Sequence, residues 1–172
     1  GDPGRGADFL GRARRMTTTP WWRPDRFAAR RGNLRVRGAI IAALRDWVAG
    51  DNFIEVETPA LGIAPPPEPQ LVPFRTALQP PGDATGMPMF LHTSPELAMK
   101  KLLAAGMERI WQPARVFRNG ERAATHHPEF TMIEWYRAGA DYRELMADCE
   151  GILRVARTAA HVKTLHWNGQ SS

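Results

Sequence analysis

The sequence predicts an α+β domain in which helices pack against an antiparallel sheet. Two segments, residues 36–48 and 142–156, carry apolar side chains at helical spacing. Short segments rich in β-branched and aromatic residues lie between them, separated mainly by loops that contain Gly and Pro. Strands and helices do not alternate as in a doubly wound parallel sheet, and no internal repeat is visible.

The composition is that of one domain with a single core. The chain has 172 residues, of which 43% are hydrophobic. Cys149 is the only cysteine, so an intrachain disulfide is impossible and a reducing cytoplasm is expected. An apolar run of about 20 residues, which a membrane-spanning helix needs, is absent, and the first segment does not resemble a secretory signal. We therefore expect no membrane partner.

The charge is unevenly distributed along the chain. The net charge is +5, but residues 1–37 hold ten arginines against three aspartates, which leaves about −2 for the remainder. We expect residues 1–32 to be a basic, flexible tail, residues 33–160 the domain, and residues 161–172 an atypical end. The tail could contact phosphates or an acidic protein, or be solvated. Met16 is typical of a native start, which would place residues 1–15 upstream of it.

The first elements are a helix and a strand. Apolar residues recur at helical spacing from Val36 to Val48, and Gly50 provides a stop. Residues 53–58 alternate apolar and acidic side chains as a strand does, and Pro59 ends it.

The middle of the chain predicts loops, two short strands and a helix. Residues 64–70 contain four prolines and are expected to form a loop. Residues 71–77 and 90–93 are predicted strands around a turn-rich connection. Ser94, Pro95 and Glu96 together are typical of a helix start, and the helix is expected to run to about Ala105 before Gly106.

The last elements are two strands and a helix. Residues 109–118 and 129–136 are predicted strands joined by a polar loop. Asp141 then caps a helix with Glu144 at capping-box spacing. The predicted inner face of that helix consists of Tyr142, Leu145, Met146, Cys149, Ile152, Leu153 and Ala156.

One strand face combines a carboxylate with aromatic rings. By the period of two, Phe130, Met132, Glu134 and Tyr136 lie on the same side of their strand. A partly buried carboxylate is costly unless a cation meets it, so a ligand ammonium is one natural partner. An ordinary ion pair with Arg115 or Arg118 is the alternative.

Arg118 stands where a predicted strand enters the polar loop. A guanidinium at such a place suits a phosphate or carboxylate, because arginine binds both with two parallel hydrogen bonds. A plain surface role is the alternative. The adjacent His126 and His127 have no third ligand at zinc spacing, so no metal site is expected.

Three ordered segments resemble one known family. Phe117-Arg118-Asn119 followed by residues 126–136, HHPEFTMIEWY, resembles motif 2 of the class II lysyl-tRNA-synthetase-like family. The helix and the segment FIEVETP at residues 53–59 resemble motif 1, which forms the dimer interface in that family. Thr93 to Leu97 with residues 100–106 resemble the amino-acid-binding segment. The resemblance covers residues 33–156.

The resemblance implies the class II antiparallel sheet flanked by helices, incomplete at its C-terminus because the family's motif 3 has no counterpart here. It also implies ATP and Mg²⁺ as cofactors. Arg118 would bind the α-phosphate and act as the catalytic residue, and Phe130 would stack on adenine. Glu96 would bind the α-ammonium of the substrate, and Glu134 and Tyr136 its side-chain amine. The remaining implied contacts are Asn119, Glu121 and His127 for ATP, and Ser94 and Pro95 for the substrate.

Within that family the sequence is most similar to the ligases that attach lysine or β-lysine to elongation factor P. Only some fifty residues precede the motif 1 segment, which leaves no room for the anticodon-binding barrel of a tRNA-charging enzyme. A homodimer is expected. A tRNA-charging fragment and a non-catalytic binding module are the alternatives. Gly120 and His127 depart from the usual Glu and Asn of the family, which affects the expected ATP contacts.

Overall fold

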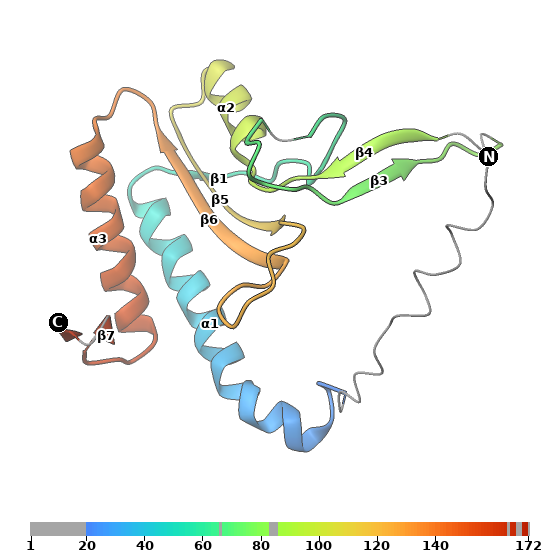
Figure 1. Ribbon diagram of the computed structural model, residues 1–172. Coiled ribbons are helices and arrows are strands. Elements are labelled where there is room, and N and C mark those ends of the chain that lie inside the picture. The colour runs from blue at the N-terminus through green and yellow to red at the C-terminus, as the bar shows by residue number, and fades with distance from the viewer. Residues whose placement is uncertain (1–19, 66, 83–85, 165, 168–169, 172) are drawn as a thin grey trace.

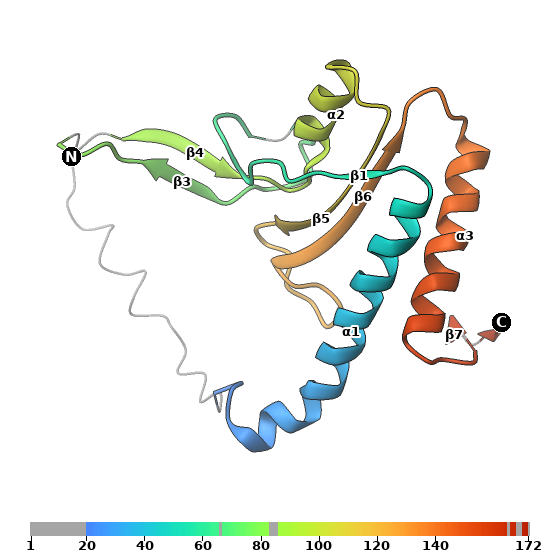
Figure 2. The same cartoon turned by 180° about the vertical axis from the view of Figure 1, so that it is seen from behind.

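The computed structural model describes residues 20–65, 67–82, 86–164, 166–167 and 170–171, and Figures 1 and 2 show it from opposite sides. The expectations for residues 1–15 and Met16 lie outside these residues. Helices α1 (Pro24–Gly50) and α3 (Tyr142–Ala159) lie side by side against a three-stranded sheet. A separate two-stranded pair, β7 (His166–Trp167) and β8 (Gln170–Ser171), follows α3. No helix of the described part of the chain is long and apolar enough to cross a membrane.

Helix α1 is longer than the apolar pattern predicts. It ends at Gly50 as expected, with Leu44 and Val48 buried, but it begins at Pro24. Residues 24–32, expected as part of a flexible tail, are therefore helical. Proline at the start of a helix costs no hydrogen bond and fixes a helical φ. The N-terminal half of α1 extends past the sheet and is almost wholly exposed (Figures 1 and 2).

The central sheet is mixed rather than purely antiparallel. Its order is β1 (Ile54–Glu55), β5 (Arg109–Phe117), β6 (Glu129–Arg137). β5 and β6 pair antiparallel along their whole length, from Arg109 opposite Arg137 to Phe117 opposite Glu129. β1, however, pairs with β5 in parallel, Ile54 with Ile110 and Glu55 with Trp111. The α+β class is confirmed, and the antiparallel expectation is corrected for β1.

The strand predicted at residues 53–58 is much shorter in the structure. After Glu55, the N–H of Val56 still donates to the carbonyl of Trp111, and the chain then leaves the sheet. Pro113 lies two residues further along β5 and has no N–H to continue the ladder. The predicted alternation fails at Ile54, which is 56% exposed while the preceding Phe53 is buried. It holds from Glu55 to Thr58, where both glutamates are exposed and Thr58 is buried.

A second three-stranded sheet extends to one side of the first (Figure 1). Its order is β2 (Leu61–Gly62), β4 (Met87–Leu91), β3 (Arg75–Leu78), all antiparallel. The expected strands at 71–77 and 90–93 correspond to β3 and β4, each displaced by several residues. β2 was not predicted, because a two-residue strand leaves too little pattern to detect.

Helix α2 (Glu96–Ala104) begins close to the predicted position. Pro95 precedes the first helical residue instead of occupying it, and the Ser94 hydroxyl accepts from the N–H of Glu96 at 3.0 Å. Met99 is completely buried. Gly106 has a φ of +102°, a left-handed conformation that favours glycine and ends the helix as expected.

The core lies between the sheet and the two long helices. Leu44, Val48, Phe53 and Trp111 form its buried cluster. Around it pack Ile40, Trp47, Ile133, Trp135, Ile152 and Val155. The odd-numbered residues of β6 therefore face the helices, and the even-numbered ones face the opposite side.

Helix α3 has its predicted cap but only part of its predicted inner face, because Ile152 packs against the core and Ala156 is partly buried. The Asp141 carboxylate accepts from the N–H groups of Arg143 and Glu144. The residues buried on α3 are Asp148 and Gly151. Much of the predicted stripe is exposed: Tyr142 by 64% and Leu153 by 56%, with Leu145, Met146 and Cys149 exposed too.

A charged network explains the orientation of α3. Asp148 accepts hydrogen bonds from Arg137 Nε at 2.7 Å and Nη2 at 2.8 Å, and from Trp135 Nε1 at 3.0 Å. Arg137 also pairs with Asp51, to which Arg109 Nη1 donates at 2.8 Å. This network joins the end of α1 to both long strands and to α3.

Candidate functional site

The carboxylate of Glu134 is held by two neutral hydroxyl groups. Tyr136 OH donates to Glu134 Oε1 at 2.5 Å, and Ser94 Oγ donates to Oε2 at 2.8 Å. Arg115 and Arg118 pair with Glu129 and Glu121 instead, so the ion-pair alternative from the sequence is not what the structure has. A partly buried carboxylate whose partners are neutral retains its charge for a cationic ligand.

Ser94 connects this carboxylate to the start of α2. Its oxygen accepts from the N–H of Glu96 while its hydroxyl donates to Glu134, so one side chain fixes both acidic residues. Pro95 between them is buried, which makes the turn rigid. Glu96 itself accepts from Lys100 Nζ at 2.5 Å. The structure therefore brings together the predicted substrate residues Ser94, Pro95, Glu96, Glu134 and Tyr136.

The electrostatics of these side chains follow from burial and charge. Burial, together with the hydrogen bond to Glu134, raises the pKa of Tyr136 far above its ordinary value, so the phenol stays protonated and donates. The hydrogen bond to Glu96 raises the pKa of Lys100, and the charges of Glu134 and Glu68 add to that effect.

Arg118 lies one residue from the same site. Its Nε donates to the carbonyl of Thr93 at 3.3 Å, and Thr93 directly precedes Ser94. The guanidinium carbon lies 5.3 Å from the centre of the Phe130 ring, a cation–π geometry. Nη1 is 3.7 Å from Glu121 Oε1. A cation beside a half-buried aromatic ring is suited to an anionic group next to a planar one.

Asn119 and His127, which are also predicted to bind ATP, lie in the loop between β5 and β6. The N–H of Asn119 donates to the carbonyl of Val72, which anchors the start of the loop. Gly120 has a φ of +88°, a left-handed conformation where the family's usual Glu would be strained. His127 is exposed, and its Nδ1 lies 2.8 Å from the carbonyl oxygen of Glu129.

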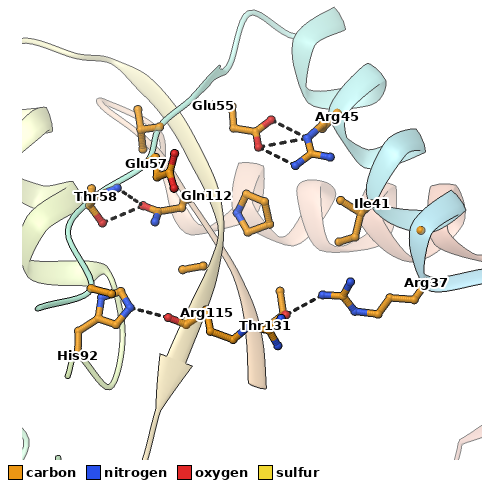
Figure 3. Close-up of a pocket in the computed structure, with 15 residues that line it drawn as sticks. Arg37, Ile41, Arg45, Glu55, Glu57, Thr58, His92, Gln112, Arg115 and Thr131 are labelled. Carbon is orange, nitrogen blue, oxygen red and sulfur yellow. Dashed lines mark hydrogen bonds and ion pairs between the residues drawn. The ribbon is translucent and has the colours of Figure 1, made fainter. Parts of the chain in front are cut away.

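A hollow lies beside α1 and is lined by residues of α1, β1 and β5, among others (Figure 3). Its volume is about 910 Å³, and it contains no predicted site residue. Arg45 donates to Glu55, and Arg37 donates to Thr131 at 2.7 Å. The sequence reasoning did not identify this hollow, because its lining combines elements that are far apart in the chain.

The residues that the structure describes do not include a group of three His, Cys, Asp or Glu side chains that could hold a metal ion.

Comparison with known proteins gives a consistent result. A family model described as tRNA synthetases class II (D, K and N) matches residues 21–167. An elongation factor P–(R)-β-lysine ligase of Erwinia tasmaniensis is 41% identical over 152 residues, which is 88% of this chain and 46% of that protein. The ligase of the same description from Pectobacterium carotovorum is 45% identical over 139 residues, 81% of this chain and 42% of that protein. This chain thus spans less than half the length of these curated relatives.

Proposed function

Because the chain belongs to the class II tRNA synthetase family (D, K and N), we propose that it supplies the amino-acid-activating part of a ligase that attaches lysine or β-lysine to elongation factor P. The observation that carries this proposal is the carboxylate of Glu134, held by Ser94 and Tyr136 beside a second carboxylate, Glu96. Two acidic groups suit an amino acid that carries two ammonium groups. Activity of the whole ligase is part of the proposal.

The proposed reaction is adenylation. A carboxylate oxygen of the amino acid attacks the α-phosphorus of ATP, a P–O bond forms to that oxygen, and the bond to pyrophosphate breaks. Glu134 and Glu96 would orient the amino acid, while Arg118 would bind the α-phosphate and stabilise its developing charge. Phe130, with one face near Arg118, would stack on the adenine ring. A lysine side-chain amine of elongation factor P would then attack the activated carboxyl carbon, so that an amide bond forms, the bond to the phosphate oxygen breaks, and AMP and a proton are released.

Mg²⁺ is implied by the family. Mg²⁺ is usually bound by one or two carboxylates together with substrate phosphates. The acidic, Cys and His side chains that the structure describes do not form a group of three that could hold the ion by themselves. Glu121, close to Arg118, is the acidic residue of the loop on this side of the site.

The proposal also covers the oligomeric state, the acceptor and the compartment. Helix α1 and strand β1 would form a homodimer interface, because they correspond to the motif 1 segment. Elongation factor P, named in the relatives' descriptions, is a more suitable acceptor than tRNA. The cytoplasm, where translation factors act, is the proposed compartment.

A hybrid protein tests this function. The chain would replace the matched segment of the Pectobacterium ligase, so that the rest of the fold is present. We expect pyrophosphate exchange that depends on lysine or (R)-β-lysine, and a mass increase of elongation factor P equal to one such residue. Glu134→Gln should raise the KM for these substrates and reduce their advantage over norleucine, which lacks the side-chain amine.

The hybrid also separates the alternatives. Charging of tRNA without modification of elongation factor P would favour the tRNA-synthetase reading. A folded hybrid that binds elongation factor P but catalyses no exchange would favour a non-catalytic binding module.

A further inference from the structure

The carboxylate of Glu96 already has an ammonium partner. Lys100, one turn further along α2, donates from Nζ to Glu96 Oε1 at 2.5 Å. The Glu96 side chain is only 37% exposed, and its N–H is bonded to the Ser94 hydroxyl that holds Glu134. This lysine–glutamate pair therefore belongs to the edge of the candidate site and not to a remote helix surface.

Two further carboxylates act on the same ammonium. Glu134 and Glu68 both stabilise the charged form of Lys100, after the larger contribution of Glu96. Glu68 also lines a cavity of about 560 Å³ together with Ser94 and Glu96. Lys100 thus contacts Glu96 directly, and the charges of Glu134 and Glu68 add to the preference for its ammonium form.

We infer that Lys100 is a resident ammonium that competes with the substrate's ammonium for Glu96, so that substrate binding displaces Lys100 from Glu96. This inference rests on the proposed function, because it requires an amino acid with two ammonium groups. Such a substrate presents one ammonium to Glu134 and one to Glu96. Lys100 must then release Glu96, since two cations at a single carboxylate repel each other.

The pair would otherwise be an ordinary helix contact. Glutamate and lysine four residues apart stabilise a helix slightly, whatever lies nearby. The two roles differ in their effect on ligand binding. If Lys100 only makes a helix contact, replacing it leaves the affinity for lysine unchanged. If Lys100 competes with the substrate, replacing it raises that affinity.

Binding of small ligands to the full chain of 172 residues tests the competition. Isothermal titration would compare lysine with 6-aminohexanoate, which keeps the side-chain amine and lacks the α-ammonium. We expect Lys100→Met to lower the Kd for lysine by about 2- to 5-fold, the range of one solvent-exposed ion pair. The Kd for 6-aminohexanoate should not change. Lys163→Met, at an exposed lysine that does not line this cavity, is the control, and it should leave both values unchanged.

The remaining variant and outcomes each decide the inference. Lys100→Arg retains the cation and should bind lysine as the unmodified chain does. Equal lysine affinities for the unmodified chain and Lys100→Met would overturn the inference and leave the proposed function intact. Weaker binding by Lys100→Met would overturn it too, because Lys100 would then support the site. If the unmodified chain does not prefer lysine to norleucine, the proposed function fails, and this inference fails with it.

Discussion

Arg118 is the residue whose loss should affect activation most. It lies next to Phe130 and bonds to Thr93, which directly precedes Ser94, and the proposed function assigns it the α-phosphate of ATP. In the hybrid ligase, Arg118→Ala should lower pyrophosphate exchange at least about 100-fold, or about 2.7 kcal/mol of transition-state stabilisation. Arg115→Ala, at an exposed arginine of the preceding strand β5, is the control. Near-normal exchange by a folded Arg118→Ala protein would remove Arg118 from this role.

Asp148 should contribute to the stability of the folded protein. Its side chain is 7% exposed and that of Arg137 10%, and the two form a bidentate pair. Removing one partner of a buried pair costs about 3 kcal/mol when the other charge is left uncompensated, and Arg137 would keep only its pair with Asp51, so a loss of up to about 3 kcal/mol is expected. Urea unfolding of Asp148→Asn should show this loss, while Glu150→Gln, at an exposed position of α3, should not. Equal unfolding midpoints for both variants would contradict the role of the network.

Asp51 should make the protein sensitive to acid. Hydrogen bonding from Arg137 lowers the pKa of Asp51 below its ordinary value. A lowered pKa contributes stability above the unfolded-state value of about 3.9, and that contribution is lost as pH falls through the folded-state value. The stability difference between the unmodified chain and Asp51→Asn should therefore shrink below about pH 4. Unfolding measured from pH 7 to pH 3 checks this, and parallel curves would exclude it.

The sequence predicts the residues of the site better than their contacts. The period of two places Glu134 and Tyr136 on one face, and the structure confirms that they meet. Ser94 is 40 residues away from Glu134, and a pattern within one strand cannot indicate such a partner. Lys100 was missed as a site residue because its spacing from Glu96 is also that of an ordinary surface pair.

At the scale of elements, the contact between α1 and α3 depends on a glycine. A Cβ added to Gly151 would lie 2.4 Å from Cζ2 of Trp47, far inside van der Waals distance. Gly151→Ala should therefore destabilise the protein by about 1–3 kcal/mol through overpacking. Gly32→Ala is the matched control, because nothing lies within 4 Å of that position and alanine favours a helix. A thermal midpoint for Gly151→Ala equal to that of the control would show that the helices separate easily.

The incorrect prediction for α3 also belongs to this scale. The helix carries two faces that could be inner ones, and the apolar pattern identifies the one with Tyr142 and Leu153. The structure turns Asp148 and Gly151 inward instead, because Arg137 and Trp135 bind the carboxylate and Trp47 fits only against glycine. The apolar pattern alone indicates neither the partners of the Asp148 carboxylate nor the close approach of Trp47 to Gly151. The cap at Asp141 was predictable because it depends on local spacing alone.

At the scale of the whole molecule, one long strand has a free edge. The N–H of Ala138 donates to the carbonyl of Glu108, and that of Arg118 to Pro128, so in this register the even-numbered residues of β6 bond to β5. The odd-numbered residues then direct their N–H and carbonyl groups outward. In the described part of the chain no strand lies beyond β6.

Amide hydrogen exchange of the chain at low concentration should show this difference. The amides of Thr131, Ile133 and Trp135 should exchange faster than those of Met132 and Glu134, because only the latter have a partner in β5. At higher concentration the odd-numbered amides should become protected as chains pair at this edge, and light scattering should report a dimer or larger species. Equal exchange of both sets in a monomer would show that the edge is covered.

The other side of β5, which faces away from β6 and pairs with β1 only at its start, has few backbone groups free for pairing. There the carbonyl of Trp111 accepts from Val56, Pro113 has no N–H to offer, the carbonyl of Arg115 is bonded to the His92 ring, and the N–H of Phe117 donates to the His92 carbonyl. A foreign strand finds no row of vacant groups on that side. Pairing of another chain with this central sheet should therefore occur at β6 and not at β5, and a cysteine cross-link that covers the β6 edge should prevent pairing through this sheet.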